Sequence, residues 1–226
     1  VSKFHFTRSQ QDEIALSSFE RAQYATREKL FASEITPLTL QTKQGEQVLE
    51  QDEHPFSVNP EKIPKLSPAF DKAGTVTAGN ASSIADGAAA LVLMRLSEAN
   101  KRGIKPIAKI IGHMAAAKNP AEYTTAPVDA TKALLKKINW TVNQVDLFEV
   151  NEAFAVVTLA AMHDLNIPHE KVNIHGGACA LGHPIGASGA RILTTLISAL
   201  RKKGLKRGVA SLCIGGGEAT AVAVEI

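Results

Sequence analysis

Apolar residues recur at helical spacing near the start of the chain, and strand-like and helix-like runs alternate toward its end. Ile14, Phe19 and Ala22 fall on one helical face, and Thr7 and Gln10 have the spacing of a capping box. We therefore predict an amphipathic helix across the opening segment, TRSQQDEIALSSFERAQYATREK, followed by a short strand at EITPLTL.

The middle of the chain is less regular. Residues 41–68 are polar, proline-rich and without sustained periodicity, so we expect an irregular excursion of about 28 residues, long enough for a functional loop or lid. The segment GTVTAGNASSIADGAAALVLM predicts a loop, a short helix and then a buried strand through Met94. A compact helix should follow, with Ser97 as its N-cap and Gly103 just past its end.

Strands and helices alternate from residue 106 to the end of the chain. The predicted strands are IAKIIGH, VDLFEV, KVNIH, GVASLC and ATAVAVEI. The predicted helices are DATKALLKKI, NEAFAVVTLAAMHDL and GASGARILTTLISALRKK. This order is typical of βαβ units, and it predicts an α/β fold in which a sheet is layered with helices.

Composition narrows the class of protein. The 226 residues are 45% hydrophobic, which allows one large domain or two small ones. The net charge is only +3 and aromatic residues make up 5%, which argues against nucleic-acid binding. Two cysteines cannot form a disulfide framework, so we expect a reducing compartment. No apolar run reaches the ~18 residues of a membrane span, and the first residues lack the apolar centre of a signal peptide. They also lack an initiator Met, so we expect a processed or truncated chain.

The stretch HGGACALGHPIGASGARI is rich in glycine but matches no phosphate-binding or nucleophile motif. A Walker A loop would need a lysine after Gly186, and a dinucleotide fingerprint would need a further glycine before the Gly186-x-x-Gly189 pair. Ser188 stands one residue out of frame for a nucleophile elbow. Three possible metal ligands occur at four-residue steps: His175, Cys179 and His183. Because such spacing converges only on a helix, which the local glycines and proline disfavour, we predict no metal site.

Three polar side chains lie where strands of the predicted sheet end. His183 should occupy a tight turn before a helix that begins near Gly186, because Pro184 disfavours helical backbone at the residue before it. Cys213 ends a strand that opens into three glycines, and Asn151 joins a strand to a helix. Each also fits a structural role: a histidine in a crowded turn, a buried inert thiol, or a helix N-cap. Together, at strand ends of one sheet, they predict a functional site.

Four motifs in this order give the chain a family resemblance. AGNASS (preceded by FDKAGTVT), NEAFA, GGxxALGHPIGASGAR and CIGGG resemble the motifs of the thiolase family, and the similarity covers essentially the whole chain. The similarity is greatest to the biosynthetic branch of the family, which acts on acetoacetyl-CoA. The resemblance implies a layered α-β-α-β-α fold of mixed sheets covered by helices. Residues 1–70 would be the remainder of a substrate-covering loop domain, residues 71–103 the end of the N-terminal domain and residues 104–226 the C-terminal domain.

The resemblance also implies roles for individual residues. His183 would activate the acylated nucleophile and help bind the thioester oxygen, with a water held by Asn151. Cys213 would exchange a proton with the α-carbon of the second acyl-CoA, and the Gly215 N–H would belong to a second oxyanion site. The implied substrate-binding residues are Ser82 and Ala78 at the pantetheine arm, with Phe70, Ala153 and Phe154 along the tunnel.

The implied reaction is an acetyl-CoA acetyltransferase activity, the reversible Claisen condensation of two acetyl-CoA to acetoacetyl-CoA and CoA. It needs no cofactor beyond the coenzyme A thioesters. Donors in a dry site would stabilise the developing oxyanion, each by about 3–4 kcal/mol. A thiol whose pKa lies near 8.5, lowered by its neighbours, would serve as base. The alternatives are a degradative 3-ketoacyl-CoA thiolase and a non-catalytic acyl-CoA-binding subunit.

The chain departs from the family pattern at the nucleophile. The family's acyl-carrying cysteine lies in an upstream segment that this chain does not contain, and Cys179 stands where many members carry an aliphatic residue. We therefore expect an inactive fragment that needs the N-terminal half of the same protein. His175 replaces a common Asn, Glu218 a common Met or Gln, and Tyr123 lies in a region that lines the acyl site. We expect a homodimer or homotetramer in the cytoplasm, or in mitochondria if a presequence was lost, with no nucleic-acid or membrane partner.

Overall fold

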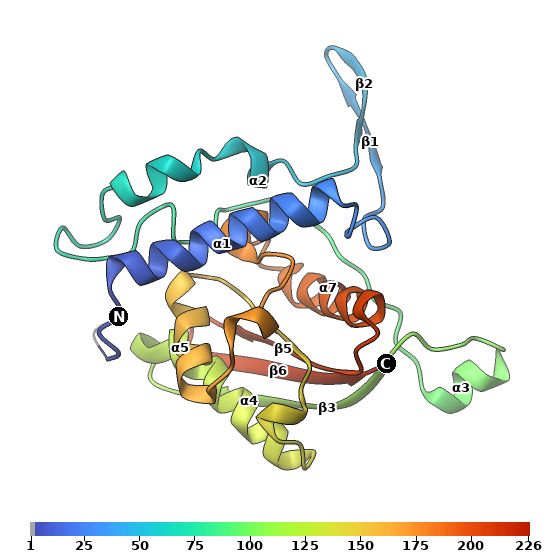
Figure 1. Cartoon of the computed structure of the whole chain (residues 1–226). Helices are drawn as coiled ribbons and strands as arrows, with labels where there is room; N and C mark the ends of the chain where they lie inside the picture. Colours follow the sequence, from blue (N-terminus) through green and yellow to red (C-terminus); the bar gives the residue numbers. More distant parts are fainter. Residues whose placement is uncertain (1–2) are drawn as a thin grey trace.

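The computed structural model of the chain describes residues 3–226 (Figure 1). The α-helices are α1 Arg8–Arg27, α2 His54–Ser57, α3 Leu96–Lys101, α4 Ala126–Lys137, α5 Ala155–Leu165, α6 Ala178–Leu181 and α7 Ser188–Lys203. The strands are β1 Leu38–Thr42, β2 Gly45–Leu49, β3 Lys109–Ala117, β4 Leu147–Val150, β5 Arg207–Cys213 and β6 Glu218–Glu225. Short 3₁₀ turns are η1 Pro60–Lys65, η2 Pro120–Thr125, η3 Val142–Gln144 and η4 His169–Lys171. None of the helices in the described range is long and apolar enough to cross a membrane.

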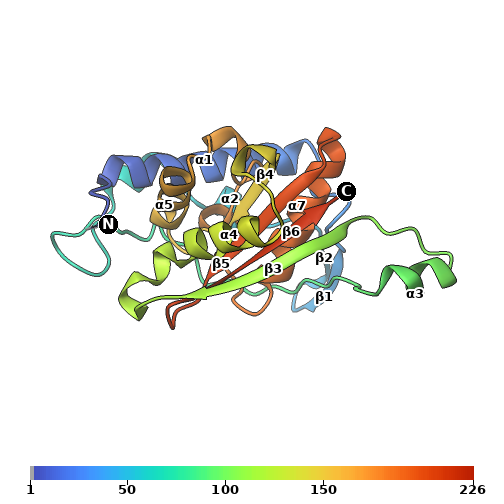
Figure 2. The same cartoon turned by 90° about the horizontal axis from the view of Figure 1, so that it is seen from below.

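Four strands form the central sheet in the order β3-β6-β5-β4 (Figure 2). β6 pairs antiparallel with both β3 and β5, whereas β4 pairs parallel with β5. Val150, at the end of β4, lies opposite Ser211, near the end of β5. Since parallel strands end at the same edge of a sheet, the residues that follow β4 and β5 are brought side by side.

Helices cover both faces of this sheet, and the side chains of β4 alternate between them. Phe148 and Val150 belong to the core that α4 and α5 cover, together with Leu134 and Val157. Leu147 instead packs with residues of α7 on the opposite face. All of β4 is therefore buried. The prediction of an α/β fold with a mixed sheet covered by helices is confirmed.

The predicted opening helix is α1, which lies above α5 in Figure 1 and packs against both α5 and α6. Its capping box is present: the Gln10 N–H donates to Thr7 Oγ1, and the Thr7 N–H donates to Gln10 Oε1 at 2.8 Å. On its buried face, Ile14 packs against Ala155 of α5 and Cys179 of α6. The helical periodicity in the sequence therefore reflects burial against other helices.

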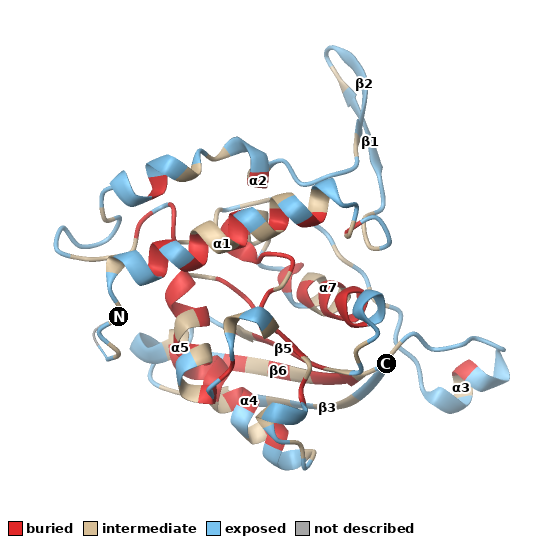
Figure 3. Ribbon diagram, viewed as in Figure 1, coloured by how far each residue is buried: buried red, intermediate tan, exposed pale blue. Residues whose placement is uncertain are grey.

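Residues 41–68 contain more regular structure than we predicted. β1 and β2 form an antiparallel hairpin from Leu38 to Leu49, which includes the end of the predicted strand EITPLTL. The hairpin projects away from the rest of the molecule and is almost entirely exposed (Figure 3). Because neither face is buried, its sequence shows no apolar alternation, and this is why pattern analysis missed it.

The predicted buried strand through Met94 is wrong. Residues 82–95 form neither a helix nor a paired strand, and Val92, Leu93 and Met94 are exposed. A strand needs a neighbour for its N–H and C=O groups, and no strand within residues 3–226 pairs with this segment. The N-cap prediction for the next helix was also wrong, because α3 begins before Ser97 and has Arg95 at its N-cap.

The predicted strand KVNIH is reduced to one isolated bridge between Val172 and Phe148. Asn173 turns the chain away from the sheet with φ 48°. Its side chain then pairs with both backbone groups of Val150: Oδ1 accepts from the N–H at 2.8 Å, and Nδ2 donates to the carbonyl at 2.8 Å. A side chain therefore replaces the backbone ladder that a strand would have made.

His175 should make the protein sensitive to acid. It is 4% exposed beside Phe31, and burial, with the charges of Lys202 and Lys203, lowers its pKa from 6.5 to about 4. The unfolded chain then binds the proton first, so stability should fall by about 3 kcal/mol as the pH drops from 6.5 to about 4. Urea unfolding across this pH range should show the fall in the free energy of unfolding in wild type and not in His175→Asn. If the stability difference between the two proteins does not change with pH, the prediction is contradicted.

Candidate functional site

Asn151 lies directly after β4, at the edge of the sheet where β5 also ends. Its backbone N–H donates to the Ser211 carbonyl at 2.9 Å. α5 begins only at Ala155, with Phe154 at the N-cap, so the alternative role of Asn151 as a helix cap is wrong. The Asn151 side chain is 1% exposed, and its Nδ2 lies 3.3 Å from Nε2 of His183.

His183 lies between α6 and α7, outside both helices. Its backbone N–H donates to the Ser83 carbonyl at 3.0 Å, which joins it to the predicted substrate loop. Its Nδ1 lies 2.6 Å from Oγ of Ser188, the first residue of α7. The helix thus begins two residues later than the predicted Gly186, because the chain first closes a tight turn in which the Pro184 carbonyl accepts from the Ser188 N–H.

The hydrogen bonds around His183 fix which ring nitrogen carries the proton. Asn151 Nδ2 can only donate, so Nε2 of His183 accepts. Ser188 Oγ donates to the Pro184 carbonyl at 2.9 Å and therefore accepts the Nδ1 proton. Burial lowers the pKa of His183, and the charge of Arg191 acts in the same direction. The ring is thereby favoured as a neutral base with its lone pair at Nε2.

Cys213 ends β5 on the face of the sheet that α4 and α5 cover, and it is 7% exposed. We expected its neighbours to lower the pKa of the thiol, and this was wrong. Burial raises the pKa of Cys213 to about 11, and a backbone hydrogen bond opposes only part of that effect. Burial also raises the pKa of the nearby Tyr123, with a smaller effect from Cys213. At neutral pH the thiol is therefore protonated, the form that can give a proton.

The glycines after Cys213 form the turn into β6. The Ile214 N–H donates to the Glu218 carbonyl at 2.8 Å, and the Gly217 N–H donates to the Ile214 carbonyl at 3.1 Å. A side chain added at Gly215 would meet no atom within 4 Å, so the space beside this exposed residue is open. The oxyanion role of the Gly215 N–H stays a prediction.

Four of the five predicted substrate-binding residues lie in direct contact around the start of α5. Ser82 donates twice to the Ala153 carbonyl, from its N–H at 3.1 Å and from Oγ at 3.0 Å. The rings of Phe70 and Phe154 meet edge to face with centroids 6.1 Å apart. Ala78 is exposed on the same loop as Ser82. Their contact with a substrate stays a prediction.

Asn80, which the sequence patterns did not single out, holds this loop in place. It is 1% exposed; its Oδ1 accepts from the Thr77 N–H at 2.9 Å, and its Nδ2 donates to Asp12 Oδ1 at 2.8 Å and the Thr75 carbonyl at 3.0 Å. The Asn80 carbonyl accepts from the Ala155 N–H at 2.9 Å. The available signal was an asparagine beside a glycine in AGNASS, since asparagine side chains commonly bond nearby backbone in turns.

Asn80→Ala should lower the free energy of unfolding by about 2–4 kcal/mol, because it leaves buried donors and acceptors without partners. Urea unfolding would measure the loss. Asn59→Ala is the matched control, since Asn59 is exposed and accepts one N–H from Glu61. An equal loss of unfolding free energy in both variants would contradict the prediction, because the buried contacts of Asn80 would then contribute no more than one exposed hydrogen bond.

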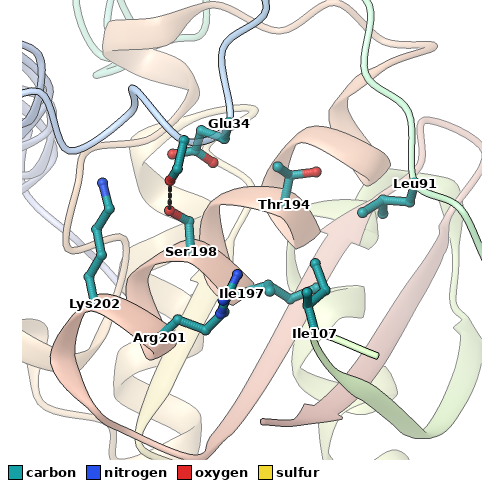
Figure 4. A pocket seen from close by; sticks show the side chains of 9 residues that line it. Glu34, Leu91, Ile107, Thr194, Ile197, Ser198, Arg201 and Lys202 are labelled. Atoms are coloured by element: carbon teal, nitrogen blue, oxygen red, sulfur yellow. Dashed lines mark hydrogen bonds between the residues drawn. The ribbon is translucent and has the colours of Figure 1, made fainter. Parts of the chain in front are cut away.

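One cavity adjoins the candidate site and another does not. A hollow of about 430 Å³ lies between residues 85–89 and residues 184–187, next to His183. A second, of about 360 Å³, is lined by Glu34, Arg201 and Lys202 along α7 (Figure 4). Neither lining includes a predicted site residue, and only the first hollow reaches a neighbour of one, Pro184, which follows His183 in the sequence.

The residues that could have formed a metal site do not gather. Within the described range, no three His, Cys, Asp or Glu side chains are placed to hold a metal ion. A one-turn helix, α6, does form between the glycine pair and Pro184, which we had not expected. It contains Cys179 but neither histidine. His175 packs against Phe31, whereas His183 contacts Asn151 and Ser188.

Comparison with known proteins places the chain in a family. The model of the thiolase C-terminal domain matches residues 104–226, and that of the thiolase N-terminal domain matches residues 1–97. The chain is 46% identical over 224 residues to an acetyl-CoA acetyltransferase of Rhizobium meliloti (strain 1021), covering 99% of this chain and 57% of that protein.

Solved structures agree. A Bacillus anthracis acetyl-CoA acetyltransferase superposes with a TM-score of 0.96 at 43% identity, over 100% of this chain and 57% of that one. Human mitochondrial 3-ketoacyl-CoA thiolase superposes with a TM-score of 0.91 at 37% identity, over 99% of this chain and 57% of that one. The chain thus spans little more than half the length of these relatives. By sequence motifs, domain models and layered α/β fold, the chain belongs to the thiolase family.

Proposed function

We propose that the chain contributes to an acetyl-CoA acetyltransferase, which reversibly condenses two acetyl-CoA into acetoacetyl-CoA and CoA. The observation that carries the proposal is the line of contacts from Asn151 through His183 to Ser188. It leaves a neutral imidazole with its lone pair at the edge of the sheet where β4 and β5 end. The relatives named acetyl-CoA acetyltransferase, at 42–47% identity, support the same reaction.

In this proposal, the 3.3 Å contact with Asn151 Nδ2 gives way as His183 Nε2 takes the proton of the acyl-carrying nucleophile, and the resulting Nε2–H then helps bind the thioester oxygen. The nucleophile is a cysteine that the family resemblance implies upstream of the matched region. Asn151 Oδ1 is buried and has no partner among the described residues, so it can accept from a water in the oxyanion site. Cys213, protonated at neutral pH, gives its proton to the α-carbon during cleavage and becomes a thiolate; in condensation the same thiolate takes a proton from the α-carbon.

The substrates in this proposal are coenzyme A thioesters, and no further cofactor takes part. Ser82 and Ala78 bind the pantetheine arm, and Phe70, Ala153 and Phe154 line its path. The exposed edge of the Phe70 ring, which is 77% exposed, offers an apolar surface for that arm. The assembly is a homodimer or homotetramer in the cytoplasm, which light scattering and cell fractionation of the complete natural protein would test.

The preferred length of the acyl chain in the substrate distinguishes two thiolase activities. A 3-ketoacyl-CoA thiolase is the second candidate, because the human mitochondrial enzyme of that name shares the fold. We expect kcat/KM for cleavage of acetoacetyl-CoA to exceed that for 3-ketooctanoyl-CoA by at least about 10-fold, since extra methylenes must fit the acyl pocket. Steady-state kinetics on the complete natural protein decide this, and an equal or higher value for the longer substrate would favour the second candidate.

A non-catalytic acyl-CoA-binding subunit is the candidate from another class. Its support is that both Cys179 and Cys213 are buried and that burial raises both of their pKa values, so neither resembles an activated nucleophile. Stoichiometric CoA binding without turnover by the complete natural protein would establish it.

A further inference from the structure

Glu152 is a buried carboxylate to which the proposed chemistry gives no role. It is 2% exposed. Its Oε2 accepts from Ser18 Oγ at 2.6 Å and from the Cys179 N–H at 3.1 Å, and its Oε1 accepts from Asn173 Nδ2 at 2.8 Å. The three donors belong to α1, to α6 and to the segment after η4. One side chain therefore joins three separate parts of the chain to the end of β4.

These contacts connect the two segments of the chain that carry Asn151 and His183. Glu152 directly follows Asn151 in the sequence. The helix α6, whose Cys179 N–H it holds, leads directly into His183. Asn173 holds both backbone groups of the last residue of β4, immediately before Asn151. The carboxylate thus connects the two segments from which the pair projects.

Two of the three groups that donate to Glu152 cannot act as acceptors instead, one facing each carboxylate oxygen. The Asn173 amide is oriented by Val150, which donates to its Oδ1 and accepts from its Nδ2. The Cys179 backbone N–H can only donate, whereas Ser18 Oγ, which accepts from the Gly177 N–H at 2.9 Å, donates to the carboxylate at 2.6 Å and has the Gly177 carbonyl at 3.4 Å as a longer second acceptor. Both oxygens of Glu152 must therefore accept, which a carboxylate satisfies and a carboxamide cannot. Space is equally restricted, because a Cβ at Gly177 would lie 2.3 Å from Glu152 Cδ.

We propose that Glu152 is a positioning residue, whose carboxylate fixes the contact between Asn151 Nδ2 and His183 Nε2 by tying α6 and α1 to the end of β4. The inference rests on the proposed function for its catalytic consequence. Its structural consequence, the placement of the His183 ring, does not depend on that function.

The test is Glu152→Gln in the complete natural protein. The carboxamide keeps the size of the side chain but sets an N–H against Asn173 or against the Cys179 N–H. We expect kcat for acetoacetyl-CoA thiolysis to fall about 10–100-fold, with KM changed less than about 3-fold, because displacement of a reacting group by about 1 Å has effects of this order.

Glu149→Gln is the matched control. Glu149 stands three residues earlier and is equally buried, at 2%, but it faces Arg191 on the α7 side of the sheet. Burial raises its pKa to about 8, so it is largely protonated at neutral pH and the carboxamide resembles it closely. We expect kcat to stay within about 2-fold of wild type, because the Asn151 and α6 contacts are intact.

A second readout does not require activity. Nitrogen-15 NMR of the His183 ring should report the Nδ1-protonated tautomer in wild type and in Glu149→Gln, and a mixture of tautomers in Glu152→Gln. Should Glu152→Gln fail to fold, Ser18→Ala removes one donor and should give the same tautomer change with a smaller loss of kcat. Folded Glu152→Gln or Ser18→Ala with wild-type kcat and His183 signals would overturn the proposal, as would an equal loss in Glu149→Gln. If wild type itself shows no thiolysis, the proposed function fails, and the His183 signals still decide the role of Glu152.

Discussion

Replacing His183 with alanine should lower kcat for acetoacetyl-CoA thiolysis in the complete natural protein by about 10³-fold or more. The substitution removes a general base, which is typically worth 10²–10⁴-fold. It also removes a donor to the thioester oxygen. KM should change little, because the predicted contacts to the pantetheine arm lie on other residues. Steady-state thiolysis and single-turnover acylation by acetyl-CoA should both show the loss.

Ser188→Ala is the graded control for His183→Ala. Ser188 Oγ accepts the Nδ1 proton of His183, and the two heavy atoms lie 2.6 Å apart. Loss of this hydroxyl leaves the general base in place but no longer fixes which ring nitrogen is protonated. We expect kcat to fall about 10–100-fold, as is common when the partner that orients a histidine is removed. A His183→Ala protein with unchanged kinetics would remove His183 from the mechanism. A Ser188→Ala loss larger than that of His183→Ala would mean that Ser188 does more than orient the ring.

Replacing Cys213 with alanine should separate the two half-reactions. Acyl transfer onto the enzyme should continue, because it needs only the upstream nucleophile and His183. Exchange of the α-protons of acetyl-CoA with solvent deuterium, and condensation itself, should fall about 10²–10⁴-fold with the loss of the acid–base group. Mass spectrometry of the acyl-enzyme and NMR of the exchanged acetyl-CoA measure the two steps independently.

Cys213→Ser controls for volume and polarity in the Cys213→Ala experiment. Its hydroxyl fills nearly the same space, and it is a far weaker acid than a thiol, so exchange should stay low. Proton exchange at the wild-type rate in either variant would exclude Cys213 as the acid–base group. Loss of acyl transfer in the alanine variant would mean that the cavity, and not proton transfer, explains the defect.

Much of the fold follows from local sequence, because its elements carry their own signals. The capping box of Thr7 and Gln10 marks the start of α1, and helical periodicity marks α4 and α7. Two predicted strands failed for tertiary reasons. The apolar run ending at Met94 has no strand neighbour within the described residues, and KVNIH is interrupted by the left-handed Asn173, whose side chain takes over the pairing. Periodicity describes a residue's own preference and not whether a partner strand is available.

The residues of the candidate site could be predicted from the sequence, but the hydrogen bonds that connect them could not. The order of motifs pointed to Asn151, His183 and Cys213, and the structure brings the first two within 3.3 Å of one another. The roles of Ser188 and Glu152 depend on hydrogen bonds between segments far apart in the sequence, which spacing does not reveal. The thiol pKa was predicted in the wrong direction because exposure at a strand end cannot be read from sequence, and Cys213 is buried.

The most direct test of the central claim is the intact mass of the complete natural protein after incubation with acetyl-CoA, with acetoacetyl-CoA followed in the same sample. We expect that the protein gains one acetyl group, that acetoacetyl-CoA and CoA form, and that His183→Ala abolishes the adduct. Tight binding of acetyl-CoA with no adduct and no product in the wild-type protein would contradict the account and establish an acyl-CoA-binding subunit instead.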